Sequence, residues 1–416
     1  MPPSSLAQYQ DRVEADLLKN VLPYWMEQVA DGEAGSFHAA ISNDGIVDDL
    51  QLRGSLLTSR ILWTYSAAMR VYGESDYRQM ADFAYRDLEQ RFLDPKHGGY
   101  VWSIHPDDSW DRDRKQVYGQ AFAIYALTEY HWATGLGEPL ARAQGVFALI
   151  ERHAIDAEYG GYGEAFARDW SPIEDMRLSA VDQNDPKSQN TMLHIMEAYT
   201  NLLRVWPHVD VKAALAQLID VMLDHVLDTE THHLGLFFKR DWTPTSDRIS
   251  YGHDIEASWL LWDAVQALGD DARKSRALPH VLKIAEVTLN EGCDQDGAIF
   301  NLGGPEGVSD TNKEWWPQAE GMVGFLNAAQ LSGEQSYLSA ALRIWDFIEA
   351  RLIDPAHGEW FRGVDREGQL LPQFEKVGFW KCPYHNGRAE LEAIARLTAV
   401  GLGQDSSPAT SSILAS

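Results

Sequence analysis

Asp94-Pro95-Lys96-His97-Gly98-Gly99-Tyr100 is the clearest copy of a short signature that recurs along this chain of 416 residues. The signature consists of an Asp, a few polar residues, one or two Gly, and then an aromatic or apolar residue. Further copies begin at Asp31, Asp156, Asp228, Asp294 and Asp354, and the copy at Asp228 is degenerate. A nearly regular spacing of this length indicates a repeated supersecondary unit.

Apolar residues at helical spacing lie on both sides of these signatures. Segments 77–92, 211–227 and 340–352 precede a signature, and segments 56–71, 117–132, 191–205, 257–268 and 316–331 follow one after a loop. Six such pairs predict an all-α fold, an (α/α)6 barrel of six helical hairpins. Short β-hairpins are expected in the loops, for example at 100–103 before Asp107-Asp108.

The same pattern sets the predicted domain organisation. Continuous strands alternating with helices are absent, which disfavours a Rossmann fold or an eight-fold β/α barrel. No shift in composition suggests a linker, so residues 1–402 are predicted to be a single catalytic domain. Residues 403–416 are small and polar and are predicted to form a disordered tail.

Charge and composition exclude several classes of partner. The formal net charge of −27 argues against a nucleic acid or an anionic membrane as partner, whereas a neutral ligand is easily accommodated. Cys293 and Cys382 are far apart and indicate neither a disulfide framework nor a cysteine zinc site. Without a signal sequence or an apolar run of ~18 residues, we expect a soluble, cytoplasmic monomer or homodimer.

The stretch Ser250 to Trp259 leads from a polar loop into an apolar helix. His253 and Glu256, three residues apart, share a face of its first turn, where free N–H groups favour an anion. We therefore expect Glu256 to be ionised and to orient His253. The alternative is that Glu256 only caps the helix and His253 packs beneath a loop.

Comparable polar residues occur within the first two turns of the second helix in each pair. They are Arg60, Tyr118, Gln120, Asn190, His194, His253, Glu256, Trp316, Glu320, His385 and Arg388. If these helices are the inner ones, their N-terminal ends converge on one pocket. Each residue also has a structural interpretation, such as an ion pair for Arg60, a satisfied core histidine for His194, turn chemistry for His385 and core packing for Trp316.

Two imidazoles with ordinary pKa values near ~6.5 suit the movement of a hydrogen on a carbon beside a carbonyl. Arg60 and His194 could stabilise the resulting enediolate oxygen. Trp316 and Trp380 offer flat faces for sugar rings, and the hydroxyl groups would meet Asp182, Asn190 and Glu320. Sugar epimerisation or isomerisation is thus a candidate reaction.

No nucleotide-binding glycine motif or phosphate loop is present, so we expect no cofactor. The spacing of His253 and Glu256 resembles half of a metal site, yet we expect no catalytic metal.

The sequence resembles the N-acylglucosamine 2-epimerase superfamily, and most closely its cellobiose 2-epimerase branch, from about residue 17 to about residue 402. The resemblance rests on the segments Ser59-Arg60-Ile61-Leu62-Trp63-Thr64, 117–127, Asn190-Thr191-Met192-Leu193-His194, 252–259, Trp315-Trp316-Pro317-Gln318-Ala319-Glu320, and 379–388. It departs from the pattern at Gly35-Ser36-Phe37, where paired glycines are usual, and at Cys382, where Gly is common.

The resemblance implies cofactor-free 2-epimerisation of the reducing-end glucose of β-1,4-linked disaccharides. It implies that His253 and His385 are the acid/base pair and that Glu256 supports His253. It further implies that Arg60 and His194 hold the open-chain sugar, and that the remaining contacts come from Trp316, Trp380, Asp182, Asn190, Tyr118 and Glu320.

Three alternatives remain open. A mannose 2-epimerase or an aldose–ketose isomerase would use the same enediolate. A glycoside hydrolase would use paired carboxylates on the same barrel, drawn from Glu256, Glu320 and Asp182. A non-catalytic sugar- or protein-binding module would bind without turnover.

Overall fold

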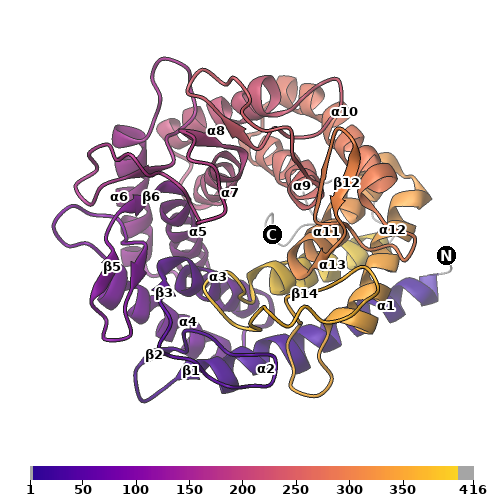
Figure 1. The fold of residues 1–416 in the computed structure, drawn as a ribbon, viewed down its shortest axis with the longest axis horizontal. Helices are drawn as coiled ribbons and strands as arrows, with labels where there is room; N and C mark the ends of the chain where they lie inside the picture. The colour runs from indigo at the N-terminus through magenta and orange to yellow at the C-terminus, as the bar shows by residue number, and fades with distance from the viewer. Residues whose placement is uncertain (1–2, 402–416) are drawn as a thin grey trace.

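Six inner helices form a closed ring within residues 3–401, the part of the chain that the computed structural model describes, with side chains described from residue 6 to residue 398 (Figure 1). They are α3 (Ser55–Tyr72), α5 (Val117–Thr134), α7 (Gln189–Val205), α9 (Tyr251–Leu268), α11 (Trp315–Ser332) and α13 (Tyr384–Gly401). Each packs against the next, and α13 packs against α3 to close the ring. The predicted tail at 403–416 lies outside the described residues.

An outer helix lies before each inner helix in the chain. These are α1 (Pro3–Asp16), α4 (Ser75–Asp87), α6 (Gly137–His153), α8 (Val209–Val221), α10 (Asp271–Val287) and α12 (Gln335–Phe347). Several continue into a wider π-helical turn, namely η3 (Leu88–Phe92), η4 (Met222–Val226), η5 (Thr288–Gly292) and η6 (Ile348–Leu352), while α1 continues through η1 (Leu17–Val21), α2 (Leu22–Tyr24) and η2 (Trp25–Val29). The predicted (α/α)6 barrel is confirmed.

Short strands precede five of the inner helices: β3 (Arg53–Gly54), β6 (Lys115–Gln116), β8 (Lys187–Ser188), β10 (Ile249–Ser250) and β13 (Lys313–Glu314). Each pairs antiparallel with a strand of the following loop, respectively β4 (Ser103–Ile104), β7 (Ala165–Phe166), β9 (Phe237–Phe238), β11 (Leu302–Gly304) and β14 (Gly363–Val364). The remaining strands are β1 (Ala30–Asp31), β2 (Ser36–Phe37), β5 (Trp110–Arg112) and β12 (Gly307–Asp310). The hairpin expected near Asp107-Asp108 is β4–β5, and its first strand starts at Ser103 rather than Tyr100.

The signature Asp has a repeated structural task. Asp94 accepts hydrogen bonds from the backbone N–H groups of Lys96 and His97, which shapes its own loop. Its other oxygen lies 3.0 Å from Nζ of Lys115, which stands on the strand that leads into the next inner helix. The same buried Lys–Asp pair recurs as Lys187–Asp156, Lys313–Asp294 and Lys376–Asp354. Each pair ties a loop of one repeat to the start of the next.

The degenerate fourth copy lacks this pair. Ile249 stands where β6, β8 and β13 carry Lys, and Asp228 accepts hydrogen bonds from the backbone N–H groups of Glu230 and Thr231. Instead Nδ1 of His233 lies 2.7 Å from Oδ2 of Asp254 on α9. The tie is kept by a different residue pair.

The paired glycines are required by backbone geometry. Gly98 and Gly99 have φ angles of 71° and 69°, in the left-handed region that residues with a Cβ rarely adopt. A Cβ on Gly99 would lie 2.6 Å from Oε1 of Gln120. That amide bonds both the N–H and the C=O of Tyr100, at 2.8 and 2.7 Å. Gln120, which stood among the pocket candidates, is therefore a loop-holding residue.

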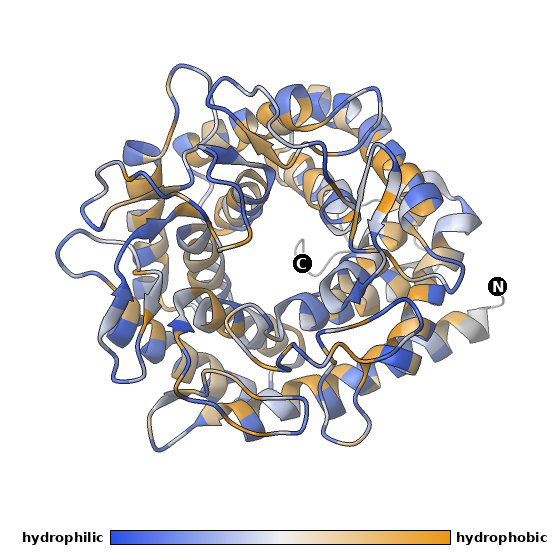
Figure 2. Ribbon diagram, in the orientation of Figure 1, coloured by the Kyte–Doolittle hydropathy of each residue, from blue (hydrophilic) through white to orange (hydrophobic). Residues whose placement is uncertain are grey.

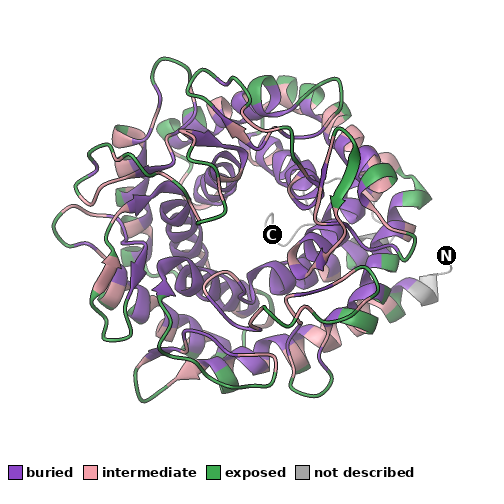
Figure 3. Ribbon diagram, in the orientation of Figure 1, coloured by how far each residue is buried: buried purple, intermediate pink, exposed green. Residues whose placement is uncertain are grey.

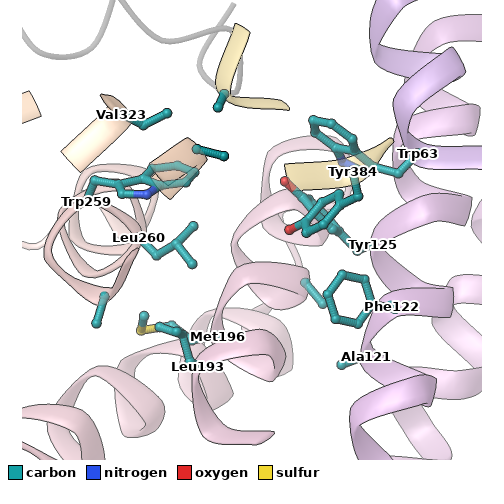
Figure 4. Close-up of a cluster of buried hydrophobic side chains, with 14 of the residues drawn as sticks. Trp63, Ala121, Phe122, Tyr125, Leu193, Met196, Trp259, Leu260, Val323 and Tyr384 are labelled. Atoms are coloured by element: carbon teal, nitrogen blue, oxygen red, sulfur yellow. The ribbon is translucent and has the colours of Figure 1, made fainter. Parts of the chain in front are cut away.

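Burial is deepest in the inner ring, as Figure 3 shows, and the ring is also rich in apolar residues (Figure 2). Figure 4 shows how aromatic side chains from different helices meet there: the ring of Trp63 lies 5.2 Å from that of Tyr125 and 5.4 Å from that of Tyr384. The centre of the ring is thus packed below the N-terminal ends of the helices. No helix within residues 3–401 has the length and apolar character needed to cross a bilayer.

Candidate active site

A cavity of about 180 Å³ opens at the N-terminal ends of the inner helices. Its walls are formed by Arg60, Tyr118, Asn190, His194, His253, Glu256, Glu314, Trp315, Trp316, Arg362, Trp380 and His385. Most of the residues singled out in the sequence are therefore brought together. A second, larger cavity of about 310 Å³ adjoins it and shares Asn190, His253 and Trp316. Asp182 lines only this outer cavity.

His253 stands on the first turn of α9, and Ser250 caps that helix. Nδ1 of His253 lies 2.8 Å from the Ser250 hydroxyl oxygen, which leaves Nε2 as the nitrogen free to meet a ligand. The expectation that Glu256 orients His253 is wrong, because the Glu256 carboxyl bonds Arg388 instead. Spacing of three residues places both side chains on one face, but it does not decide which neighbour each one reaches.

His385 has the carboxylate partner that His253 lacks. Its Nδ1 lies 2.6 Å from Oε1 of Glu320 on α11. The Trp316 ring lies 4.7 Å from the His253 ring and 5.8 Å from the His385 ring. A Cβ on Gly252 would lie 2.5 Å from the Trp316 ring, so glycine is needed there for this close approach.

Burial changes the protonation of both histidines. Desolvation lowers the pKa of His253 to about 3, helped by the nearby imidazoles. Desolvation also lowers the pKa of His385 to about 3, although Glu320 opposes the shift. In the free protein both imidazoles are therefore neutral at pH 7, whereas an ordinary pKa near ~6.5 would leave about a quarter of them protonated.

His194 is paired with Glu197, a residue that sequence reasoning missed. Its Nδ1 lies 2.8 Å from Oε2 of Glu197, and both side chains are buried. Desolvation lowers the pKa of His194, so the ring is neutral and donates its Nδ1–H to the carboxylate. The remaining nitrogen is then an acceptor. The signal was present, since His194 and Glu197 repeat the spacing of His253 and Glu256.

Arg60 is 3% exposed and lies among aromatic rings. Its Nη2 donates to the hydroxyl of Tyr118 at 2.7 Å, and its guanidinium carbon lies 4.2 Å from the centre of the Phe122 ring. Its Nε is buried without a hydrogen-bond partner among the described residues. Arg60 is thus a cation that lines the cavity and, among the described residues, forms no salt bridge.

Arg388 connects three carboxylates beneath the cavity. It donates to Glu197, to Glu256 at 2.8 Å and to Glu320 at 2.6 Å. Arg388 and the His385 hydrogen bond outweigh desolvation and lower the pKa of Glu320 to about 2. Desolvation and the charge of Glu320 raise the pKa of Glu256 well above its usual value.

Several further residues complete the walls. Trp380 lies against Trp102, with ring centres 6.0 Å apart, and remains partly exposed toward the cavity. Asp182 hydrogen-bonds the backbone and hydroxyl of Ser179 within its own loop. Glu314 and Arg362 also line the inner cavity and were not foreseen. Glu314 directly precedes α11, and this position at the start of an inner helix could have indicated that it lines the cavity.

Two groups of side chains within the described chain have the composition of a metal site. Ligand atoms of Glu256, Glu320 and His385 lie within 4.8 Å of one another, as do those of Asp31, His38 and Asp49. In the first group the guanidinium of Arg388 already occupies the carboxylate oxygens, and a divalent cation would meet its positive charge.

The geometry can be set beside proteins that this chain resembles. A model of the N-acylglucosamine 2-epimerase family matches residues 35–388. Cellobiose 2-epimerase from Bacteroides fragilis is 42% identical over 386 residues, which is 92% of this chain and 98% of that protein. The structure of cellobiose 2-epimerase from Bacillus thermoamylovorans superposes with a TM-score of 0.90 at 36% identity and covers 94% of this chain and 100% of that one. A D-mannose isomerase structure shares the fold, with a TM-score of 0.82 at 21% identity, 93% of this chain and 98% of that one.

Proposed function

The chain belongs to the N-acylglucosamine 2-epimerase family and is a carbohydrate epimerase of the isomerase class, and from this we propose that it epimerises β-1,4-linked disaccharides at the reducing end. The substrates would be cellobiose and lactose, whose glucose becomes mannose through ring opening and a cis-enediolate. The observation that carries this proposal is that His253 and His385 line one cavity with Trp316 packed against both rings.

His385 is suited to remove the C2 proton. Because Nδ1–H is donated to Glu320, the lone pair of Nε2 is available, and the ionised Glu320 stabilises the imidazolium that forms. His253 is tied by Nδ1 to a hydroxyl, which can both donate and accept. It can therefore take either protonation state without losing its partner.

The proton balance follows from these states. One histidine keeps the C2 proton while the enediolate turns about its C2–C3 bond. The negative enediolate raises the pKa of the other imidazole, which takes a proton from water and returns it to the opposite face of C2. The first histidine then releases its proton to water. Solvent hydrogen is thus built into the product at C2.

Arg60 is the cation in position to stabilise the enediolate oxygen. Its burial among aromatic rings makes the interaction stronger than it would be in water. His194, in its neutral form, offers an acceptor and would bind a sugar hydroxyl instead. Trp316 and Trp380 would stack on the sugar rings, with Asn190, Tyr118 and, in the outer cavity, Asp182 near hydroxyl groups.

The test is incubation with cellobiose, lactose, glucose and mannose in D2O, followed by NMR. We expect deuterium at C2 of the reducing-end sugar with the glycosidic bond intact. Fructose-type products would identify an isomerase, and release of glucose from cellobiose would identify a hydrolase. Replacing His253 or His385 by Ala should abolish turnover while circular dichroism remains unchanged. Substantial turnover by either variant would contradict the assignment.

A further inference from the structure

The cluster around Arg388 contains more carboxylates than cations. Three carboxyl groups, on Glu197, Glu256 and Glu320, surround one guanidinium, and Arg60 is the second cation that senses Glu256. The neighbouring imidazoles are neutral. If all three carboxyls were ionised, the buried cluster would carry a net negative charge, which a dry protein interior disfavours strongly.

One added proton makes the cluster neutral, and the hydrogen bonds indicate where that proton lies. Both oxygens of Glu320 accept hydrogen bonds, from His385, Arg388 and Trp259. Both oxygens of Glu197 also accept hydrogen bonds, from Arg388, Tyr384 and His194. Glu256 accepts one hydrogen bond on Oε1, and its Oε2 is buried without a partner among the described residues.

We infer that Glu256 is a neutral carboxylic acid in the working enzyme and that its Oε2–H donates a hydrogen bond to a sugar oxygen in the cavity. The inference rests on the proposed function and assigns the α9 carboxyl a different task from orienting His253. Glu256 lines the inner cavity together with Arg60, so both residues lie beside a sugar bound there. A neutral His194 cannot donate a hydrogen bond to the sugar, because its free nitrogen only accepts. A protonated Glu256 supplies the missing donor.

The titratable groups around Glu256 support this state. They are His253 on α9, Glu320 on α11, Arg388, His385 and Tyr384 on α13, Glu197 and His194 on α7, Arg60 on α3 and Tyr118 on α5. Two are cations and two are ionised carboxylates, so a neutral Glu256 leaves the group balanced.

The test compares two substitutions at Glu256 with the same substitution at Glu320. E256Q keeps a neutral side chain of the same shape with an N–H donor, and its kcat should lie at least about 30-fold above that of E256M. E256M removes the donor, and it should lower kcat by about 100-fold or more with little change in KM, as expected for a donor to an oxyanion. E320Q, which deprives His385 of its ionised partner, should lose activity to a similar extent.

Infrared spectroscopy gives a readout that does not depend on turnover. The wild-type minus E256Q difference spectrum at pH 7 should contain the C=O stretch of a protonated carboxyl, with a small shift in D2O. The E320Q difference spectrum should instead contain carboxylate bands. The inference is overturned if E256Q is as inactive as E256M, or if no protonated carboxyl band is lost in E256Q. If the wild type does not epimerise any sugar but the band is present, the proposed function fails while the protonation state stands.

Discussion

Ser250 is a small residue that acts on the site through its neighbour. Its hydroxyl caps α9 and also bonds Nδ1 of His253, so it fixes both the start of the helix and the direction of the imidazole. We expect S250A to lose about 1 kcal/mol of stability, the usual effect of losing an N-cap. We also expect it to lower kcat by roughly tenfold or more, because a rotating imidazole is seldom aligned with C2.

Ser188 provides the matched control for Ser250. It caps α7 in the same way, accepting from the backbone N–H of Thr191 at 3.1 Å, but among the described residues its hydroxyl forms no hydrogen bond with a histidine ring. S188A should therefore lose similar stability in thermal melts and keep a kcat near that of the wild type. Equal losses of kcat in the two variants would show that the cap, not the histidine contact, matters.

The low pKa of both histidines predicts an unusual pH profile. A catalytic base must be neutral, and a pKa near 3 keeps His253 and His385 neutral as the pH falls from 7 to 5. The profile of kcat/KM should therefore show no acid limb near pH 6.5, the position an unperturbed histidine would give. Initial rates between pH 5 and 8 check this, and a half-maximal rate at pH 6.5 would contradict it.

The lowered pKa values of the two histidines also make the stability of the fold depend on pH. The unfolded chain binds protons at these histidines near pH 6.5, whereas the folded chain does not. Stability from this source is therefore complete above about pH 6.5 and falls as the pH drops below it. Circular dichroism at each pH separates a loss of fold from a loss of turnover.

Sequence reasoning located the cavity residues better than their partners. Arg60, His194, His253, His385 and Trp316 were found because they stand at equivalent places in successive repeats. Hydrogen-bond partners depend on side-chain torsions and on helices distant in the sequence, as with His385 and Glu320, which are 65 residues apart. The ordinary pKa was assumed because burial is a property of the folded ring. The domain boundary at residue 402 stays a prediction.

At the scale of the element, the contribution of the Lys–Asp pair between repeats to stability can be tested directly. Lys115 and Asp94 are both completely buried and 3.0 Å apart. K115M removes the buried cation, but Arg168 still pairs with Asp94 at 2.9 Å, so the free energy of unfolding should fall by roughly 1–3 kcal/mol. The exposed Lys239 serves as control, and K239M should stay within about 0.5 kcal/mol in the same denaturation experiment.

Helices were predicted more completely than strands. Apolar residues at helical spacing identify segments such as 117–132, which the structure places in α5. The strands are two to four residues long and pair across loops of the next repeat, so periodicity along the chain cannot reveal them. The missing Lys at Ile249 was readable in the sequence, but its replacement by the His233–Asp254 contact required the folded loops.

At the scale of the whole molecule, the first outer helix and the last inner helix meet where α1 packs against α13. Glu390 of α13 is completely buried at this seam, and neither of its oxygens accepts a hydrogen bond from the described residues. Desolvation and the adjacent Asp16 raise its pKa well above the usual value. The folded protein therefore holds a proton that the unfolded chain releases above about pH 4.5.

This proton predicts that E390Q stabilises the protein at neutral pH. A raised carboxyl pKa reduces stability as the pH rises above the unfolded value, so Gln should raise the free energy of unfolding by at least about 1 kcal/mol at pH 7. The gain should vanish near pH 4. Calorimetry at both values checks this. E392Q, two residues further on, removes a partner of buried Arg396 and should destabilise instead.

The common direction of the inner helices has one more consequence. All six point their N-terminal ends toward the cavity, so their dipoles present a positive potential at its mouth inside a protein with a net charge of −27. In the proposed reaction the sugar arrives uncharged, so the acidic exterior would not repel it, and it would become anionic only where that internal field can stabilise it. Phosphorylated or uronic sugars carry their charge from the outset and would meet the repulsion first. We therefore expect the architecture to favour ligands whose charge is made by the proposed reaction itself.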